Sequence, residues 1–328
     1  MNFRDIMKNA FSENRSALLY FGGGVLTALG LVVGYKYLQK PKKVTRVGVV
    51  SQLLIHPIKS GKAVSVTSAE CLEMGLKFGE LKDRHWLVIT ENGNQVTGRQ
   101  EPRLVLVSMT SEGEHLCLNA PSMEELRIPV SQPRNPVVNC RVFSADIQGR
   151  DCGNEASDWL SRFLDSGKVF RLVQFEPQMR PRKAKEMEPL FPSSEKVAYP
   201  DVGAIMLLSE ASVTDLNTRL EKDASVTRFR PNIVVSGCDA FAEDSWDQIE
   251  IGDVRLYRVM SCGRCVFTTV DPETGVMDRK QPLETLKSYR LCDPSEKHIY
   301  KASPLFGQYY SVKRNGIIQV GDPVYKIC

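Results

Sequence analysis

Short runs of apolar and β-branched residues, separated by turn residues, constrain the fold of this 328-residue chain more than any other feature. β-Branched and aromatic residues favour strands, whereas Gly, Pro, Asn and Asp interrupt them. A long series of short strands with such interruptions is typical of a β-barrel or a β-sandwich. The expected strands are residues 47–58, 85–90, 95–98, 104–109, 116–118, 126–130, 140–147, 169–175, 205–208, 233–235 and 266–270, with hairpin turns at Asn92-Gly93 and Asn315-Gly316.

Helical patterns are confined to a few segments. Residues 154–164 and 282–290 are expected to be helices, the second with a proline at its start, and Ser209 is a suitable N-cap for a third helix. This mixture predicts an α+β chain. The expected order of parts is an N-terminal segment at residues 1–40, an α/β region at 41–180 and a strand-rich barrel at 181–328.

An uncharged apolar run near the N-terminus predicts a single transmembrane helix. Residues 16–35 carry no charged side chain, and twenty residues at 1.5 Å each span about 30 Å, the thickness of the hydrocarbon core. Three basic residues precede the run and five follow it closely, so the positive-inside rule places the body of the protein in the cytosol. A cleaved signal peptide is the alternative, but its apolar part is usually shorter, and no small-residue cleavage site follows Tyr35.

The basic residues are unevenly distributed. The overall formal charge is +4, but residues 1–46 alone carry +6, which leaves −2 on residues 47–328. A globular part with this charge argues against a bulk nucleic-acid binder. The nine cysteines show no disulfide-framework spacing, so we expect them to be reduced thiols.

Two thiols and a guanidinium lie close together in Cys262-Gly-Arg-Cys265. The strand expected at 266–270 disfavours a thioredoxin-like redox pair, whose first cysteine caps a helix. A zinc site is disfavoured because there is no second Cys-x-x-Cys and the four histidines are scattered. Two further interpretations are a pair of structural cysteines, and one thiolate on a soft, redox-active metal with Arg264 facing an anionic cofactor.

Two further basic segments are candidates for contacts with anions. Lys59 lies in a polar turn after the first expected strand, from which its side chain could reach an anionic cofactor. The basic run at 180–185 is typical of a solvated loop. The alternative is that this run docks an acidic redox partner or helps to hold the cofactor.

Residues 264–275, RCVFTTVDPETG, resemble the molybdenum-ligand segment of MOSC-domain proteins and, more closely, that of the amidoxime-reducing components. Further motifs match in the same order, and the resemblance extends from about residue 47 to the end. These motifs are HPIKS (56–60), DRHW (83–86), RQEPR (99–103), FRPNI (229–233), EDSW (243–246) and PLFGQY (304–309).

The resemblance implies a MOSC N-terminal region over 41–180 and a MOSC β-barrel over 181–328. It also implies that Cys265 is the metal ligand and that Cys262 is only its neighbour. Gly203 and Gly263 stand where relatives can carry hydroxyl residues, which would remove one or two hydrogen bonds to the cofactor. The positions that match cofactor-contacting residues are Lys59, Ser60, Arg84, Gly203, Arg230, Asn232, Gly263, Arg264, Cys265 and Tyr309.

The activity implied by the resemblance is reduction of amidoximes, hydroxylamines and N-oxides to amidines or amines on a molybdenum cofactor, Mo-molybdopterin. No NAD motif or haem-ligand pattern is visible, so electrons must come from outside the chain. In this family they pass from NADH through cytochrome b5 reductase and cytochrome b5. The implied location is the mitochondrial outer membrane, with a peroxisomal membrane as a second location.

Other functions remain open at this stage. The first is a membrane-anchored carrier of the molybdenum cofactor without its own turnover. The second is a module that receives sulfur, which the absence of a long N-terminal pyridoxal-enzyme region disfavours. The third is a thiol-based membrane scaffold that binds no metal.

Overall fold

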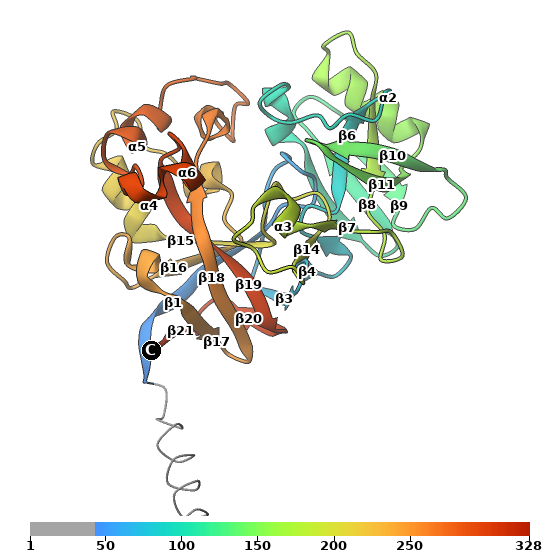
Figure 1. Ribbon diagram of the computed structural model, residues 1–328. Helices are drawn as coiled ribbons and strands as arrows, with labels where there is room; N and C mark the ends of the chain where they lie inside the picture. Colours follow the sequence, from blue (N-terminus) through green and yellow to red (C-terminus); the bar gives the residue numbers. More distant parts are fainter. Residues whose placement is uncertain (1–42) are drawn as a thin grey trace, which may run out of the picture. The chain divides into compact units, whose positions relative to one another are not determined.

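The structure, a computed structural model that describes residues 43–328, contains a closed β-barrel of seven strands, of which β1 (Val44–Ile55) comes from the N-terminal end of the described chain and the other six from its C-terminal part (Figure 1). Neighbouring strands are antiparallel except for β15 and β16, which are parallel. Around the ring the strands are β1 (Val44–Ile55), β16 (Ile233–Ser236), β15 (Ile205–Ser209), β19 (Leu305–Arg314), β18 (Val254–Gly263), β17 (Gln248–Ile251) and β21 (Pro323–Ile327), which pairs again with β1.

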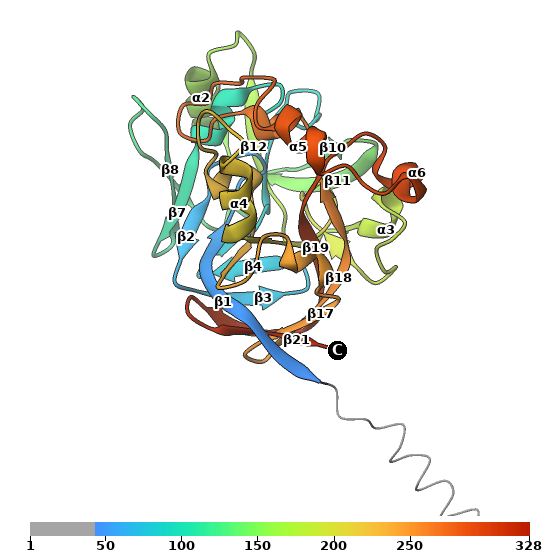
Figure 2. The ribbon, with the colours of Figure 1, turned by 90° about the vertical axis from the view of Figure 1, so that its left-hand side faces the viewer.

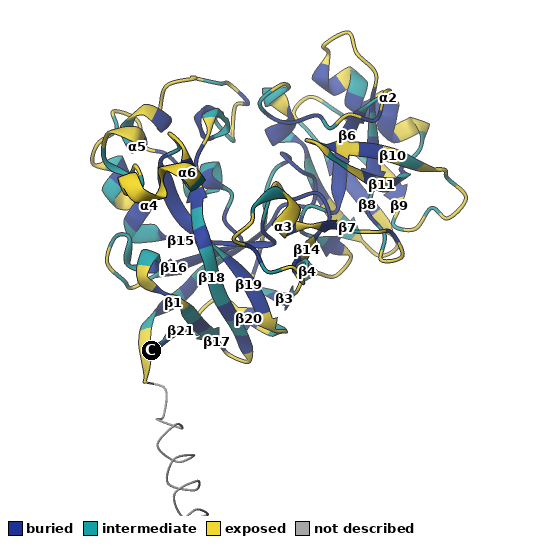
Figure 3. Cartoon of the chain, viewed as in Figure 1, coloured by how far each residue is buried: buried dark blue, intermediate teal, exposed yellow. Residues whose placement is uncertain are grey.

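The barrel closes around aliphatic side chains that the strand alternation points inward. Ile233 is in register with Leu53 on one side and with Leu207 on the other, and all three are fully buried. A slip of one residue would turn these side chains to the opposite face, so their burial fixes the register. Figure 3 shows buried residues along the barrel strands and exposed residues on the surrounding turns and helices.

The N-terminal part consists mainly of small antiparallel sheets. The α-helix α2 (Asn154–Leu164) packs against β9 and β12. The α/β character expected for 41–180 is therefore wrong, because its described strands pair with antiparallel neighbours instead of forming β-α-β units. The sheets are β10 (Val137–Val142), β11 (Ala145–Asp151), β12 (Phe170–Gln174) and β6 (Trp86–Thr90); β20 (Gly316–Gln319), β3 (Ser68–Leu72), β4 (Gly75–Phe78) and β5 (Leu81–Lys82); and β7 (Ser108–Glu112), β8 (His115–Asn119) and β9 (Leu126–Pro129).

The three expected helices are present. The first coincides with α2. The second is α4 (Glu210–Asn217), where the hydroxyl of Ser209 accepts the Ser212 N–H at 3.1 Å. This helix contacts β15 and β16, and it faces the viewer in Figure 2. The third, α5 (Leu283–Tyr289), follows Pro282.

The remaining short elements are β2 (Val64–Val66), β13 (Arg182–Lys183), β14 (Lys196–Val197), α3 (Ala184–Met187), α6 (Lys297–Tyr300) and the 3₁₀ turns η1 (Pro102–Leu106), η2 (Val226–Phe229), η3 (Ala242–Ser245), η4 (Val266–Thr269) and η5 (Pro294–Glu296).

The strand expected at 266–270 is wrong, because η4 occupies these residues. The hydroxyl of Thr268 donates to the carbonyl of Cys265 at 2.9 Å, and that of Thr269 donates to the carbonyl of Val266 at 2.8 Å. Threonine side chains that bond carbonyls three residues earlier stabilise a turn at the expense of an extended strand. Cys265 therefore lies where β18 gives way to a tight turn.

Four other expectations about strands are corrected. Residues 104–109 begin in η1, and residues 140–147 form a hairpin with its turn at Phe143 and Ser144. Residues 95–98 make only one bridge, between Gln95 and Ile89. After Asn315 the chain leaves β19, and β20 pairs with β3, so no final hairpin forms.

The apolar run at 16–35 lies outside the described residues. Within residues 43–328, no helix has the length and apolar character needed to cross a membrane.

Candidate functional site

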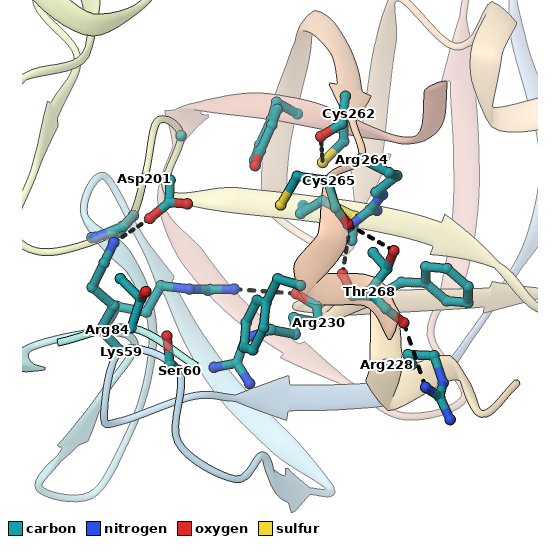
Figure 4. A pocket seen from close by; sticks show the side chains of 18 of the residues that line it. Lys59, Ser60, Arg84, Asp201, Arg228, Arg230, Cys262, Arg264, Cys265 and Thr268 are labelled. Atoms are coloured by element: carbon teal, nitrogen blue, oxygen red, sulfur yellow. Dashed lines mark hydrogen bonds and ion pairs between the residues drawn. The ribbon is translucent and has the colours of Figure 1, made fainter. Parts of the chain in front are cut away.

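A cavity that is open to solvent is lined by residues of the barrel and of the N-terminal part (Figure 4). Lys59, Ser60 and Arg84 come from segments that flank β1 and β6, and Cys265 lies just after β18, immediately before η4. All ten residues that the resemblance selected line this one cavity, although they are far apart in the chain. They are Lys59, Ser60, Arg84, Gly203, Arg230, Asn232, Gly263, Arg264, Cys265 and Tyr309.

The two cysteines of the Cys-x-x-Cys segment have different surroundings. Cys265 is exposed, and Nη1 of Arg99 lies 3.6 Å from its Sγ. Cys262 is only 4% exposed and packs in an apolar cluster with Met206 and Phe306. Both cysteines line the cavity, and Cys265 is the better placed to bind a metal because its thiol is the exposed one.

All nine cysteines are free thiols, as expected. Within the described part of the chain, no three His, Cys, Asp or Glu side chains gather closely enough to hold a metal ion by themselves. The described lining therefore offers a metal the exposed thiol of Cys265, with the buried Cys262 beside it, and not a complete protein ligand set.

Three residues of the cavity wall have left-handed backbone conformations. The φ angles are +66° for Ser60, +50° for Arg84 and +56° for Arg230. This region is costly for residues other than glycine, by about 1–2 kcal/mol each, and such strain concentrates at functional sites. The surrounding hydrogen bonds hold these residues there, including one of 2.7 Å from the Arg84 N–H to the carbonyl of His56.

A buried polar network fixes Arg84. Asp83 is fully buried, pairs with the Arg84 guanidinium and accepts the His56 N–H at 2.8 Å. Nη2 of Arg84 donates to the carbonyl of Arg230 at 3.2 Å. Oδ1 of Asn232 accepts the Met206 N–H at 3.1 Å, so Asn232 helps to join β15 to the following strand.

Lys59 and Asp201 form an ion pair in the cavity wall (Figure 4). Burial lowers the pKa of Lys59 to about 8, against the opposing effect of Asp201. The cavity walls disfavour the charged form of Asp201, but the Lys59 ammonium outweighs them and lowers the pKa of Asp201. Nζ of Lys59 also donates to the carbonyl of Tyr199 at 2.8 Å.

Positive charge exceeds negative charge in this cavity. Asp201 is the one carboxylate among the lining residues, against Lys59 and five arginines. Burial and the nearby Arg84 lower the pKa of Arg230 to about 9, and its buried Nη2 has no hydrogen-bond partner in the described structure. Burial and the same two arginines hold the pKa of His56 well below its ordinary value. An anion in the cavity would relieve this repulsion and satisfy Arg230.

Arg264 lies in the cavity wall, but its donors are directed differently from the expectation. Nε donates to the carbonyl of Phe306 and Nη1 to that of Phe229, both at 2.8 Å. The side chain is 7% exposed. Arg264 therefore holds two backbone segments together beside Cys265, and its guanidinium does not face the cavity as a free donor.

The basic run at 180–185 is only partly a solvated loop. Lys183 and Lys185 are exposed, but Arg182 is buried, and its Nε donates to the carbonyl of Ala198 at 2.9 Å. Its Nη2 donates to the carbonyl of Pro200, next to Asp201. The expectation of a solvated loop is wrong for Arg182, because its guanidinium is buried and donates to these two carbonyls.

Several lining residues were not selected from the sequence. Arg99 lies in the RQEPR motif, which carried the resemblance without being assigned to the site, and Asp201 is two residues before Gly203. Arg228, which pairs with Asp271 at 3.1 Å, had only its proximity to Arg230 as a signal.

The chain matches two family models. Residues 47–167 match the MOSC N-terminal beta barrel domain, and residues 194–325 match the MOSC domain. Mitochondrial amidoxime-reducing component 1 of Danio rerio is 59% identical over 327 residues, covering 100% of this chain and 99% of the relative. The human proteins named mitochondrial amidoxime-reducing component 1 and 2 are 56% and 52% identical, covering 85% and 93% of this chain and 83% and 91% of the relatives. The chain therefore belongs to the mitochondrial amidoxime-reducing component family of MOSC-domain proteins.

Proposed function

We propose that this protein is a molybdenum-cofactor oxidoreductase that reduces N-hydroxylated compounds. The observation that carries the proposal is one exposed thiol, Cys265, at the wall of a cavity with surplus positive charge. The unpartnered Nη2 of Arg230 fits an anionic group such as the phosphate of a pterin cofactor. The names of the relatives, amidoxime-reducing components, supply the class of substrate.

The residues fit the cofactor in distinct roles. Cys265 would hold the metal, because thiolate suits a soft, redox-active ion. Arg230, Arg84 and Ser60 would hold the phosphate and pterin, since arginine forks match such groups. When bound, the cofactor supplies the two-electron chemistry that removes oxygen from the substrate.

The polypeptide contributes orientation and a proton store. Arg99 lies against Sγ of Cys265 and is positioned to orient a polar N–O group beside the thiol. Lys59, with a pKa of about 8, holds a proton at Nζ at neutral pH and can release it within the cavity. Reduction of an N–O bond to water consumes protons, and the Lys59–Asp201 pair is a local source.

Electrons are proposed to reach the site from NADH through cytochrome b5 reductase and cytochrome b5. The N-terminal apolar run would place the protein in the same membrane as these partners and so raise their effective concentration. We place that membrane at the mitochondrial surface, since the relatives are named mitochondrial. We place the body in the cytosol because of the basic residues that follow the apolar run.

Turnover tests the proposal. Full-length protein in detergent, with NADH, cytochrome b5 reductase and cytochrome b5, is expected to convert benzamidoxime to benzamidine. The Cys265→Ala variant should be inactive, and Cys262→Ala should retain activity if it folds. Protein that binds metal and pterin but gives no product, with either the electron chain or a chemical reductant, would instead be a cofactor carrier.

A further inference from the structure

Phe143 occupies an unusual position beside the cavity wall, where its ring contacts two of the lining residues. It forms, with Ser144, the turn between β10 and β11, where Val142 pairs with Ala145. Its φ is +55°, a region that bulky side chains rarely adopt, and 47% of the residue is exposed. A two-residue hairpin turn requires a positive φ at its first position, which glycine usually fills. The turn therefore accounts for the conformation, but it does not account for a large exposed aromatic residue at this position.

The Phe143 ring faces two cations of the cavity wall. Nζ of Lys59 lies 5.4 Å from the ring centroid, and Cζ of Arg99 lies 5.6 Å from it. Arg99 in turn contacts Sγ of Cys265. The ring is thus separated from the thiol by a single side chain, and it contacts two residues that line the cavity without lining the cavity itself.

The turn that carries Phe143 is tied to the site. The hydroxyl of Tyr199 donates to the carbonyl of Gln148 in β11 at 3.0 Å, and the carbonyl of Tyr199 accepts from Lys59. The ring is therefore attached to the same framework as the cavity wall. An exposed aromatic face held in this way offers a stacking surface to a flat ligand.

We propose that Phe143 is a substrate-contacting residue that favours N-hydroxylated compounds with a planar aromatic group beside the N–O bond. The inference rests on the proposed function. With the N–O group near Cys265 and Arg99, the rest of the substrate extends toward solvent past Phe143. An aromatic substituent stacks on the ring there, whereas a methyl group does not reach it.

The test compares benzamidoxime with acetamidoxime, in which methyl replaces phenyl. Aromatic pairing predicts that Phe143→Gly raises KM for benzamidoxime about 3- to 10-fold, with little change in kcat or in KM for acetamidoxime. Phe143→Tyr should retain the wild-type KM. Glycine accepts a positive φ, so Phe143→Gly should be at least as stable as the wild type. Val137→Ala, which removes a side chain of similar exposure from β10, is the control and should change neither KM.

Two further measurements separate the possible failures. Ligand-observed NMR should show weaker benzamidine binding to Phe143→Gly, and this readout does not need turnover. Molybdenum and pterin content should be unchanged. Equal effects on both amidoximes, unchanged KM and binding, or loss of cofactor would overturn the role of Phe143. A wild type that reduces neither amidoxime would overturn the proposed function, while the binding measurement would still decide on Phe143.

Discussion

Nη1 of Arg99 lies 3.6 Å from Sγ of Cys265, so a guanidinium of the N-terminal part contacts the exposed thiol that follows β18. The two residues are 166 positions apart in the chain. The thiol therefore faces a positively charged surface that only the assembled fold creates. This relationship makes the reactivity of Cys265 a direct probe of the site.

Iodoacetate is anionic and iodoacetamide is neutral, so the ratio of their alkylation rates at a thiol reports the local charge. In the cofactor-free protein, this iodoacetate-to-iodoacetamide ratio should be higher for Cys265 than for the exposed Cys328. A unit charge about 4 Å away contributes about 1 kcal/mol in water, so Arg99→Gln should lower the iodoacetate-to-iodoacetamide rate ratio about fivefold. Mass spectrometry of the modified peptides measures both rates. The difference between the rate ratios of Cys265 and Cys328 should shrink at high salt, because salt screens the charge of Arg99. A ratio that Arg99→Gln leaves unchanged would contradict this electrostatic role.

Asp83→Asn should lower the free energy of unfolding by about 3 kcal/mol, because it leaves the Arg84 guanidinium largely buried without its partner. Asparagine can still accept the His56 N–H, so the loss reports the charge pair and not the hydrogen bond. Urea denaturation measures the effect. Glu70→Gln, which removes the partly exposed Lys77 pair, is the matched control and should cost less than about 1 kcal/mol. Equal losses in the two variants would refute the argument.

Substitution by serine should lower the stability of the protein at Gly203 but not at Gly263. A Cβ on Gly203 would lie 2.8 Å from Cζ of Phe191 and 3.0 Å from Cδ1 of Tyr309, so Gly203→Ser should cost about 1–3 kcal/mol and lower cofactor content. A Cβ on Gly263 would lie 3.3 Å from Cβ of Ser303, a contact that a small shift relieves. Gly263→Ser should therefore fold with nearly wild-type stability. Thermal unfolding measures the stability of the two variants. If Gly263→Ser were less stable than Gly203→Ser, the side chains of Phe191 and Tyr309 would have moved aside more easily than the distances predict.

Anion binding and stability should change in opposite directions with pH. Lys59 has a pKa of about 8 in the folded protein, so it loses its charge as pH rises through 8, and Arg230 follows near 9. Sulfate binding to the cofactor-free protein, measured by calorimetry, should weaken over this range. The folded-state pKa of Lys59 is below its ordinary value, so the unfolded chain binds more protons between about pH 8 and 10.5 and the contribution of Lys59 to stability rises there. Lys59→Gln should remove both trends near pH 8, and persistence of either would exclude Lys59 as the titrating group.

The exposed part of the basic run should affect partner-driven turnover alone. Replacing Lys183 and Lys185 with glutamate should raise the KM for cytochrome b5 several-fold at low salt, because exposed charges steer an acidic partner. Turnover with a chemical reductant should stay unchanged. Arg182→Gln should instead destabilise the protein, since its guanidinium binds the carbonyls of Ala198 and Pro200. Equal KM values for cytochrome b5 in the wild type and the glutamate variant would rule out docking at this run.

Local sequence predicted the parts of the fold that local interactions determine. The helix predicted at 154–164 is present, because its apolar residues recur with the 3.6-residue period of an α-helix. The strand at 266–270 was wrong because two threonine hydroxyls stabilise a turn there, which β-propensity does not include. The pairing of β20 with β3 depends on residues about 250 positions apart, beyond the reach of turn signals.

The candidate site was predictable from family motifs but not from residue chemistry alone. The motifs selected ten residues, which the fold brings to one cavity. They did not indicate that Arg264 binds the carbonyls of Phe229 and Phe306, or that Arg182 is buried. In both cases the guanidinium donates to backbone carbonyls. Every residue type has the same backbone carbonyl, so the identity of the neighbouring residues does not predict these hydrogen bonds.

The central claim is that Cys265 holds molybdenum in this cavity. The most direct measurement is the molybdenum and pterin content of full-length protein, purified from a host that makes the cofactor, beside its Cys265→Ala and Cys262→Ala variants. The account predicts near-stoichiometric metal and pterin in the wild type and in Cys262→Ala, and loss of metal in Cys265→Ala. Wild-type protein without metal or pterin, or Cys265→Ala with undiminished metal, would contradict it.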